Sequence, residues 1–162
     1  MRFPYPLPLQ QGRLPIIVSQ LTPMKKVTGI GGILFTCKDP NQLKQWYAKH
    51  LGMPTDEYGV NFVWRKDDKP EERGCTQWSA MPEGSAYMQP STAPFMINYR
   101  VENLDAIVAD LKREGVTVLD EIEVTDYGKF VHILDGEGHK VELWEPIDSE
   151  YEKLLDAQIP SE

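Results

Sequence analysis

Residues 129–146 read "KFVHILDGEGHKVELWEP" and contain two short runs rich in apolar and β-branched residues around a turn-forming segment. Two such runs joined by a few residues that include glycine are typical of a β-hairpin. With the turn placed at Asp135–His139, Leu134 is paired with Lys140. The stretch therefore predicts two antiparallel strands whose register is counted outward from the turn.

Counting outward from this turn places His132 opposite Glu142 and Phe130 opposite Trp144. Because side chains alternate between the faces of a strand, all four project from one face, with opposite Cβ atoms about 5 Å apart. A carboxylate that faces an imidazole has three interpretations, which the sequence leaves open. It is a cross-strand ion pair that stabilises the hairpin, an acid–base pair with the histidine poised near neutral pH, or part of a metal site.

The chain before the hairpin contains the same order of elements twice. In each copy a strand-like run is followed by an N-cap residue, a short helix with an apolar stripe, and a glycine that ends the helix. The N-caps are Asp39 and Asn103, which lie 64 residues apart, and the glycines are Gly52 and Gly115, which lie 63 residues apart. Short strands follow each helix, so each copy has the order β-α-β-β-β.

Two such copies predict an α+β fold in which two βαβββ modules form a cupped mixed sheet. One helix covers only one face of a module's sheet, so the free faces are expected to surround a cavity. The modules are expected at about residues 26–88 and 89–146, within a single domain at residues 24–146. Residues 1–23, with five prolines, predict an irregular extension, and residues 147–162 predict a tail with a short amphipathic helix.

The composition narrows the functional classes. A net charge of −8 argues against non-specific binding of nucleic acid, which needs a basic face. No apolar run approaches the ~20 residues that a membrane-spanning helix needs. Cys37 and Cys75 are expected to be free thiols, although one disulfide between them stays open. These features favour a cytoplasmic protein whose partners are neither nucleic acids nor membranes.

Two segments resemble the vicinal oxygen chelate superfamily, which includes glyoxalase-like lyases, extradiol dioxygenases and bleomycin-resistance proteins. The ending "DGEGHKVELWEP" (135–146) is similar to the closing motif of the superfamily, and "WYAKHLGM" (46–53) matches the end of its first helix. The resemblance covers residues 26–146. It implies a cupped sheet around a small-molecule site, a homodimer and, in many members, a divalent metal held by the first and last strands of both modules.

The resemblance also assigns positions to the metal ligands. The last-strand carboxylate matches Glu142, and the first-strand ligands match Gly32 and Met96. The last-strand ligand of the first module falls at Gln77 or Trp78. Glycine has no side-chain donor and methionine does not suit a hard divalent ion, since such ions prefer carboxylate, imidazole and water. A glycine at position 32 leaves room instead for a bulkier organic molecule.

We therefore expect Glu142 and His132 to be the catalytic residues, and Glu142, His132 and Gln77 to be the set that would hold a metal. The cofactor is expected to be one divalent metal (Fe, Mn, Ni or Zn) or none, and both stay open. The residues expected to line the substrate pocket are Gly32, Trp64, Trp78, Met96, Phe130 and Trp144.

Two functions from different classes follow. The first is an enzyme, namely a metal-assisted lyase, isomerase or dioxygenase that acts on a small organic molecule in the sheet cavity. The second is a metal-free protein of the bleomycin-resistance type that binds or sequesters a small molecule. The superfamily favours catalysis, whereas the poor match of the ligand positions favours binding.

Overall fold

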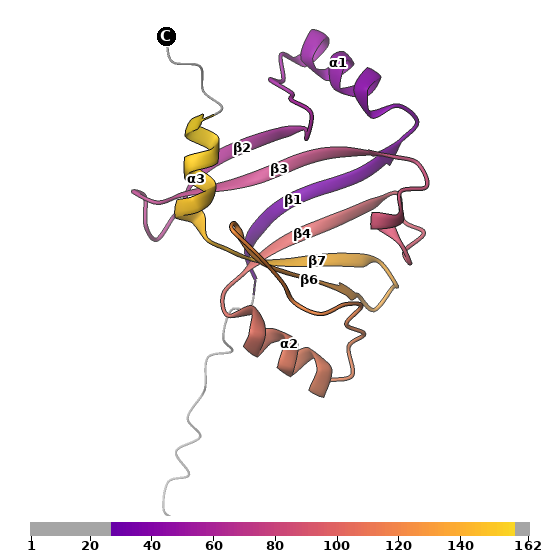
Figure 1. Ribbon diagram of the computed structural model, residues 1–162, viewed down its shortest axis with the longest axis vertical. Coiled ribbons are helices and arrows are strands. Elements are labelled where there is room, and N and C mark those ends of the chain that lie inside the picture. The colour runs from indigo at the N-terminus through magenta and orange to yellow at the C-terminus, as the bar shows by residue number, and fades with distance from the viewer. Residues whose placement is uncertain (1–26, 158–162) are drawn as a thin grey trace, which may run out of the picture.

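The computed structural model describes residues 27–157 (Figure 1). The extension predicted at residues 1–23 and the end of the predicted tail lie outside the described residues. The elements of the described part are β1 (Val27–Cys37), α1 (Pro40–Leu51), β2 (Val60–Arg65), β3 (Arg73–Pro82), the 3₁₀-helix η1 (Ala86–Met88), β4 (Phe95–Val101), α2 (Leu104–Arg113), β5 (Glu123–Thr125), β6 (Gly128–Leu134), β7 (Lys140–Pro146) and α3 (Asp148–Ala157).

The strands of the described residues form one open mixed sheet in the order β2-β3-β1-β4-β7-β6-β5. β1 runs parallel to β3 and β4 runs parallel to β7, whereas the other neighbours are antiparallel. The two halves of the chain meet where β1 pairs with β4. The predicted α+β fold with two strand–helix modules is confirmed.

The first module differs from its predicted strand order. Between β1 and β4 the structure has two further strands, β2 and β3, where the sequence predicts three. The segment at 83–94 forms η1 and turns instead. Pro90 and Pro94 lie in this segment, and prolines lack the backbone donor that a central strand needs.

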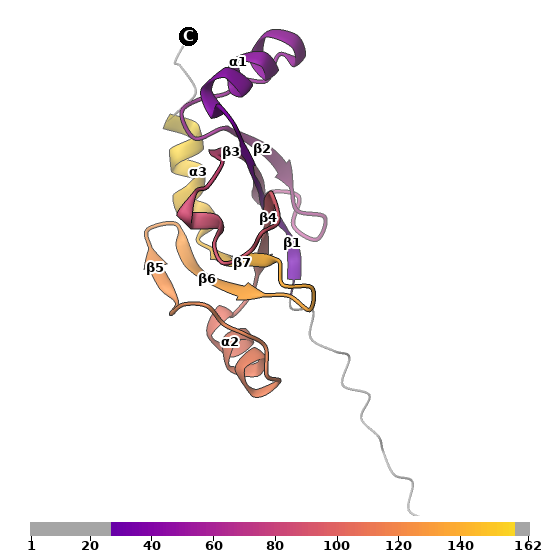
Figure 2. The same ribbon diagram turned by 90° about the vertical axis from the view of Figure 1, so that its right-hand side faces the viewer.

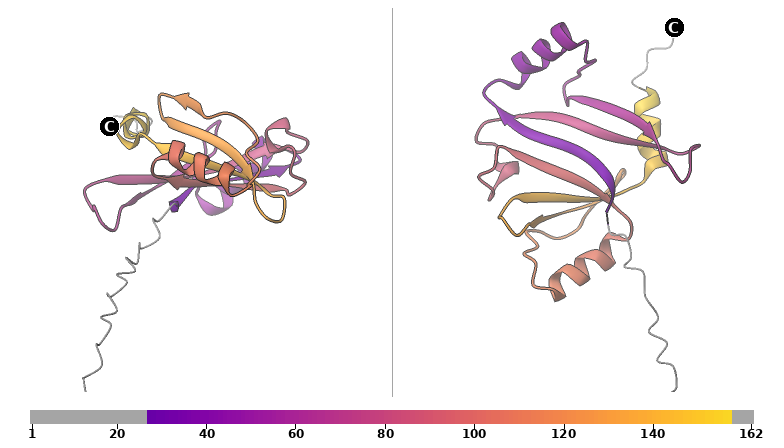
Figure 3. Two further views of the ribbon diagram at one scale, coloured as in Figure 1. Left: turned by 90° about the horizontal axis from the view of Figure 1, so that it is seen from below. Right: turned by 180° about the vertical axis from the view of Figure 1, so that it is seen from behind.

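The helices are distributed over both sides of the sheet. Figure 1 shows α1 and α2 at opposite edges of the sheet. Figures 2 and 3 show α3 and the segment with η1 on the same side of the sheet. On this side of the sheet, Tyr151 of α3 contacts Trp144 of β7. The side chains of β6 and β7 that face this side include those of the candidate functional site, His132 and Glu142.

The second module is packed as its sequence predicts. The Asn103 side chain accepts a hydrogen bond from the Ala106 N–H at 3.2 Å, and Gly115 adopts the left-handed conformation just after the end of α2. The apolar stripe of α2 is buried against β4, β6 and β7, away from the candidate site. The buried cluster consists of Val101, Leu104, Ile107, Val108, Val131 and Leu143.

The first module confirms the caps of α1 but not its whole apolar stripe. The Asp39 side chain accepts from the Gln42 N–H at 2.9 Å, and Gly52 is left-handed. Tyr47 packs on Trp78 with 4.8 Å between ring centroids. Trp46, by contrast, is half exposed. Only part of the apolar stripe of α1 is therefore packed against the sheet.

The tail forms the predicted helix, α3, which is held by charged and aromatic contacts. Arg73 of β3 forms an ion pair with Glu152 at 3.1 Å and another with Asp156. Tyr151 packs against Trp144 and donates a hydrogen bond to Asn61 at 3.0 Å. The tail therefore covers part of the sheet within the same chain.

Cys37 and Cys75 are free thiols, as predicted. Burial raises the pKa of the Cys75 thiol to about 11, so this residue is inert at neutral pH. Among the described residues there is no helix of the length and apolarity needed to cross a membrane.

Candidate functional site

The β6–β7 hairpin has the predicted register. His132 lies opposite Glu142, and Phe130 lies opposite Trp144. The rings of Phe130 and Trp144 are stacked, with 5.6 Å between their centroids and 7° between their planes. All four side chains therefore share one face, as expected from the alternation of strand side chains.

The neighbouring strands extend this pairing into a row across the sheet. Asn98 of β4 lies opposite Glu142, Gly32 of β1 lies opposite Asn98, and Gln77 of β3 lies opposite Gly32. The row therefore runs through Gln77, Gly32, Asn98, Glu142 and His132 on five adjacent strands. It joins the two modules and contains the three residues expected to hold a metal.

Glu142 is the centre of this row and is only 4% exposed. Its Oε1 accepts hydrogen bonds from the Tyr87 hydroxyl and from His132 Nε2, the latter at 3.0 Å. Its Oε2 accepts a hydrogen bond from Asn98 Nδ2. A carboxylate offers about four acceptor positions, so roughly one position on Oε2 is left.

His132 lies between two carboxylates. Its Nε2 faces Glu142, and its Nδ1 lies 2.6 Å from Asp120 Oδ2. The backbone N–H of His132 also donates to Asp120 Oδ1 at 2.8 Å. The imidazolium form of the ring satisfies both contacts, because it has a donor on each nitrogen and ionised carboxylates only accept hydrogen bonds. Because the Asp120 side chain is 44% exposed, the chain of bonds runs from the buried Glu142 to solvent.

Burial and charge shift the pKa values of these groups in opposite directions. Burial favours the neutral ring of His132, but hydrogen bonds to Glu142 and Asp120 outweigh it and raise its pKa. Burial likewise favours the neutral form of Glu142, but the donors His132, Tyr87 and Asn98 outweigh it and lower its pKa. Burial, followed by the charge of Glu142, raises the pKa of Tyr87. These shifts favour the charged forms of His132 and Glu142 and the neutral phenol of Tyr87.

Three residues of this site were missed by the sequence analysis: Asn98, Tyr87 and Asp120. Asn98 has a signal in the sequence, because it is a polar residue inside an apolar strand. Tyr87 and Asp120 lie in segments between strands, so only the tertiary structure brings them to the hairpin. Lys140 Nζ donates to the Tyr87 backbone oxygen at 2.7 Å and fixes the Tyr87 segment over the hairpin.

The residues present do not fit the divalent metal that the resemblance implies. Within residues 27–157, no group of three or more His, Cys, Asp or Glu side chains is arranged to hold a metal ion. Gly32 has no side-chain atom that could bind a metal ion. The Gln77 side chain offers only a neutral amide, whereas hard divalent ions prefer carboxylate, imidazole and water. The oxygens of Glu142 already bind three protein donors, and His132 uses both ring nitrogens within the protein. We therefore derive no chemical step through a metal.

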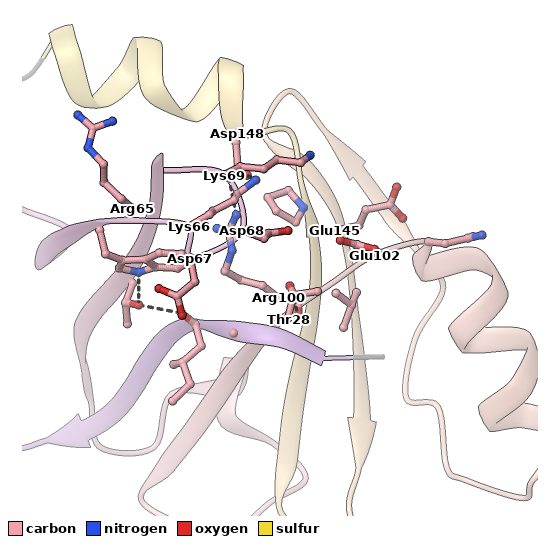
Figure 4. A pocket seen from close by; sticks show the side chains of 17 residues that line it. Thr28, Arg65, Lys66, Asp67, Asp68, Lys69, Arg100, Glu102, Glu145 and Asp148 are labelled. Carbon is pink, nitrogen blue, oxygen red and sulfur yellow. Dashed lines mark hydrogen bonds and ion pairs between the residues drawn. The ribbon is translucent and has the colours of Figure 1, made fainter. Parts of the chain in front are cut away.

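A large cavity adjoins the row rather than containing it. A cavity of about 890 Å³ lies between the start of β1, the β2–β3 turn, the end of β4 and the start of α3 (Figure 4). Arg100 and Trp64 line it. Arg100 is opposite Trp144, two pairs further along β4 and β7 than Asn98 and Glu142, and therefore on the same face.

The expected pocket residues are only partly brought together. Trp64 lines the cavity, while Trp144 and Phe130 lie on the Glu142 face next to it. Met96 is fully buried and lies opposite Leu34, two pairs away from the row. Trp78 packs against α1, and alternation places it on the face opposite to Gln77. Neither Trp78 nor Met96 is among the residues that line this cavity.

Gly31, rather than Gly32, makes the closest approach to the site. A Cβ atom at Gly31 would lie 2.1 Å from Asn98 Oδ1 and 2.8 Å from Trp144 Cε3. A Cβ atom at Gly32 would meet its nearest neighbour, a backbone oxygen, at 3.3 Å. The pairing of β1 with β4 is irregular between Ile30 and Gly32, which is how Gly31 comes to face the site.

The comparisons with known proteins agree with this architecture. Residues 29–143 match the family model of the glyoxalase/bleomycin resistance protein/dioxygenase superfamily. The chain belongs to this superfamily, and the resemblance noted in the sequence is confirmed. No match was found among curated proteins.

Solved structures of the same fold include two methylmalonyl-CoA epimerases. The enzyme from Mycobacterium tuberculosis is 19% identical, with a TM-score of 0.54, over 82% of this chain and 97% of that chain. A variant of the Streptomyces coelicolor enzyme in complex with 2-nitronate-propionyl-CoA is 20% identical, with a TM-score of 0.56, over 75% of this chain and 99% of that chain. At these identities the similarity establishes the fold alone.

Proposed function

We propose that the protein binds a small organic molecule on the sheet face that carries Glu142 and moves a proton within it, which is a reaction of the isomerase class. The observation that carries the proposal is the continuous chain of hydrogen bonds from Asp120 through His132 to Glu142 and Tyr87. Clusters of buried titratable groups with shifted pKa values are typical of sites that transfer protons.

The proposed step begins when a carbonyl oxygen of the substrate takes the hydrogen bond of the Tyr87 hydroxyl away from Glu142. Losing one of its three donors raises the pKa of Glu142, which makes it a stronger base. A proton on the carbon next to the carbonyl then passes to Glu142, and the electron pair of that C–H bond moves into the carbonyl group. Tyr87 donates to the resulting enolate oxygen.

The remaining groups support this step. Return of a proton to another position or face of the substrate completes the isomerisation, so no co-reactant is consumed. His132 keeps its positive charge next to Glu142 and steadies the carboxylate when it is ionised. Asp120 orients the ring through Nδ1 and connects it to solvent, where protons exchange.

Two further considerations support the isomerase class. The step uses only donors that the chain supplies, in keeping with a donor set that does not suit a divalent metal. The two similar structures described above carry the name of an epimerase, which is an isomerase, and one of them holds 2-nitronate-propionyl-CoA. The lyase and dioxygenase reactions expected from the superfamily have no comparable support.

Deuterium exchange tests the proposal without knowledge of the natural substrate. Methylmalonyl-CoA and 2-oxobutyrate, two small carbon acids, are incubated with the protein in D₂O, and incorporation next to the carbonyl is followed by NMR. We expect exchange with the wild type and its loss in Glu142→Gln and Tyr87→Phe. Glu137→Gln is the matched control, because Glu137 lies exposed in the hairpin turn. Wild-type protein that exchanges neither probe would contradict the proposal.

Metal-free binding without turnover is a second candidate. It is favoured by a specific observation, namely that Glu142 already accepts bonds from Tyr87, Asn98 and His132. A carboxylate in such a setting also serves to hold the sheet together around a ligand site. Binding of a probe without exchange would select this candidate over the isomerase.

The expected homodimer and the cytoplasmic location stay predictions. Size-exclusion chromatography with light scattering measures the first directly. A mass of about 37 kDa, twice the 18.5 kDa of the chain, is expected for the dimer.

A further inference from the structure

Arg100 is a buried cation with an unused donor. Its side chain is 3% exposed and lies between Trp64 and Trp144, with its Cζ 5.4 Å and 4.9 Å from the two ring centroids. Its Nη2 donates to Asp148. Within the described part of the chain, Nη1 has no hydrogen-bond partner. A buried donor without an acceptor is costly, so an acceptor that fills this position is bound favourably.

The cavity next to the row lies beside Arg100. Arg100 lines that cavity of about 890 Å³, which is within the size range of small-molecule sites (Figure 4). Other polar groups of the lining have acceptors in the protein. Thr28 Oγ1 donates to the Arg100 backbone oxygen at 3.2 Å, and Trp64 Nε1 donates to Thr76 Oγ1 at 3.0 Å. Lys66 Nζ is paired with Asp148 at 2.8 Å.

The charges around the cavity favour a single negative charge over two. Four basic and five acidic side chains line it, so a dianion such as a phosphate would meet nearby carboxylates. The charged residues are Arg65, Lys66, Lys69 and Arg100, and Asp67, Asp68, Glu102, Glu145 and Asp148. A carboxylate matches one guanidinium donor with a charge-assisted hydrogen bond.

We propose that this cavity holds the carboxylate group of a small organic acid, with Arg100 Nη1 as the donor that fixes it. The proposal rests on the proposed function and names its substrate class. Arg100 and Asn98 are two residues apart on β4 and share a face, which separates them by about 7 Å. A carboxylate at Arg100 therefore leaves the carbon chain of the acid within reach of Glu142, which is paired with Asn98.

The test uses matched ligands on the whole protein. 2-Naphthoate and its neutral analogue 2-naphthamide are titrated calorimetrically, and the indole N–H signal of Trp64 is followed by ¹⁵N NMR to locate binding. We expect the carboxylate to bind roughly tenfold tighter than the amide, because charge-assisted bonds are the stronger ones. Both should shift the Trp64 signal. Equal affinity of the two ligands, or no shift at Trp64, would overturn the proposal.

Two variants complete the test. Arg100→Lys keeps the charge but lacks the Nη1 donor, and it should remove most of the preference for the carboxylate. Arg113→Lys is the matched control, because Arg113 is an exposed arginine of α2 outside this lining, and it should keep the preference. The ligand comparison on the wild type decides the matter even if Arg100→Lys does not fold. A preference that survives in folded Arg100→Lys would overturn the proposal.

The outcome separates this inference from the proposed function. Tyr87→Phe should keep the carboxylate preference while losing deuterium exchange. A preference for carboxylates without any exchange in the wild type would uphold the Arg100 site and reject the isomerase. Exchange in the wild type without a carboxylate preference would uphold the isomerase and reject the Arg100 site.

Discussion

Replacing Glu142 by glutamine should lower the free energy of unfolding by about 3 kcal/mol at pH 6, where the ion pair is complete. Breaking a buried pair by removing one partner costs about 3–5 kcal/mol, because a charge is left without compensation. The charge left here is the imidazolium of His132, which keeps Asp120 as its second acceptor. Glutamine can also still accept the bond from Asn98, so we expect the lower end of the range.

The size of this loss should depend on pH in a direction set by the two pKa shifts. The pKa of His132 is raised, so its contribution is complete below the ordinary value of 6.5 and is lost as the pH rises through the folded value. The pKa of Glu142 is lowered, so its contribution is complete above the ordinary value of 4.5 and is lost as the pH falls through the folded value. The difference between wild type and variant should therefore be largest between pH 4.5 and 6.5 and shrink toward pH 9.

Urea unfolding followed by circular dichroism, at several pH values, measures this difference. The control is Glu137→Gln, which makes the same chemical change in the exposed hairpin turn and should stay within about 0.5 kcal/mol of the wild type. A loss below about 1 kcal/mol at pH 6, or a loss that is the same at pH 6 and pH 9, would refute the assigned ion pair.

Three further predictions concern single positions. Asp120→Asn should lower the pKa of His132, as read from the imidazole proton shifts, because one of its two carboxylate partners becomes neutral; an unchanged titration would show that Asp120 does not act on the ring. Gly31→Ala should lower the free energy of unfolding by about 1–3 kcal/mol, since the added Cβ would lie 2.1 Å from the nearest side-chain atom. Gly136→Ala, at a position with no atom within 4 Å, should change it little, and equal losses at the two glycines would contradict the close packing at the first. Cys75 should resist alkylation at pH 8 in the folded protein, because its pKa is about 11 and it is buried, so fast labelling under native conditions would speak against this position.

The hairpin is the part of the site that the sequence predicts best. Its register follows from the turn at 135–139 and from the alternation of side chains, and both are local properties of the chain. The pairing of His132 with Glu142 is therefore confirmed from one short stretch. The caps Asp39 and Asn103 are confirmed for the same reason, since each bonds a backbone N–H three residues later.

The rest of the site depends on contacts between distant segments. Tyr87 reaches Glu142 from a segment that is 55 residues away in sequence, and Asp120 reaches His132 from one that is 12 residues away. Neither lies in a strand whose register can be counted. Trp78 shows the opposite error, because its aromatic character suggested a ligand pocket while its strand position turns it toward α1.

The proposed site depends on His132 being an imidazolium held between two carboxylates. A ¹⁵N-detected NMR titration of the three histidines reports the charge and the bound protons of each ring. We predict that His132 carries protons on both ring nitrogens at pH 7 and titrates with a pKa above its ordinary value of 6.5. A His132 ring that is a neutral tautomer at pH 6, or that titrates below 6.5, would contradict the site as described.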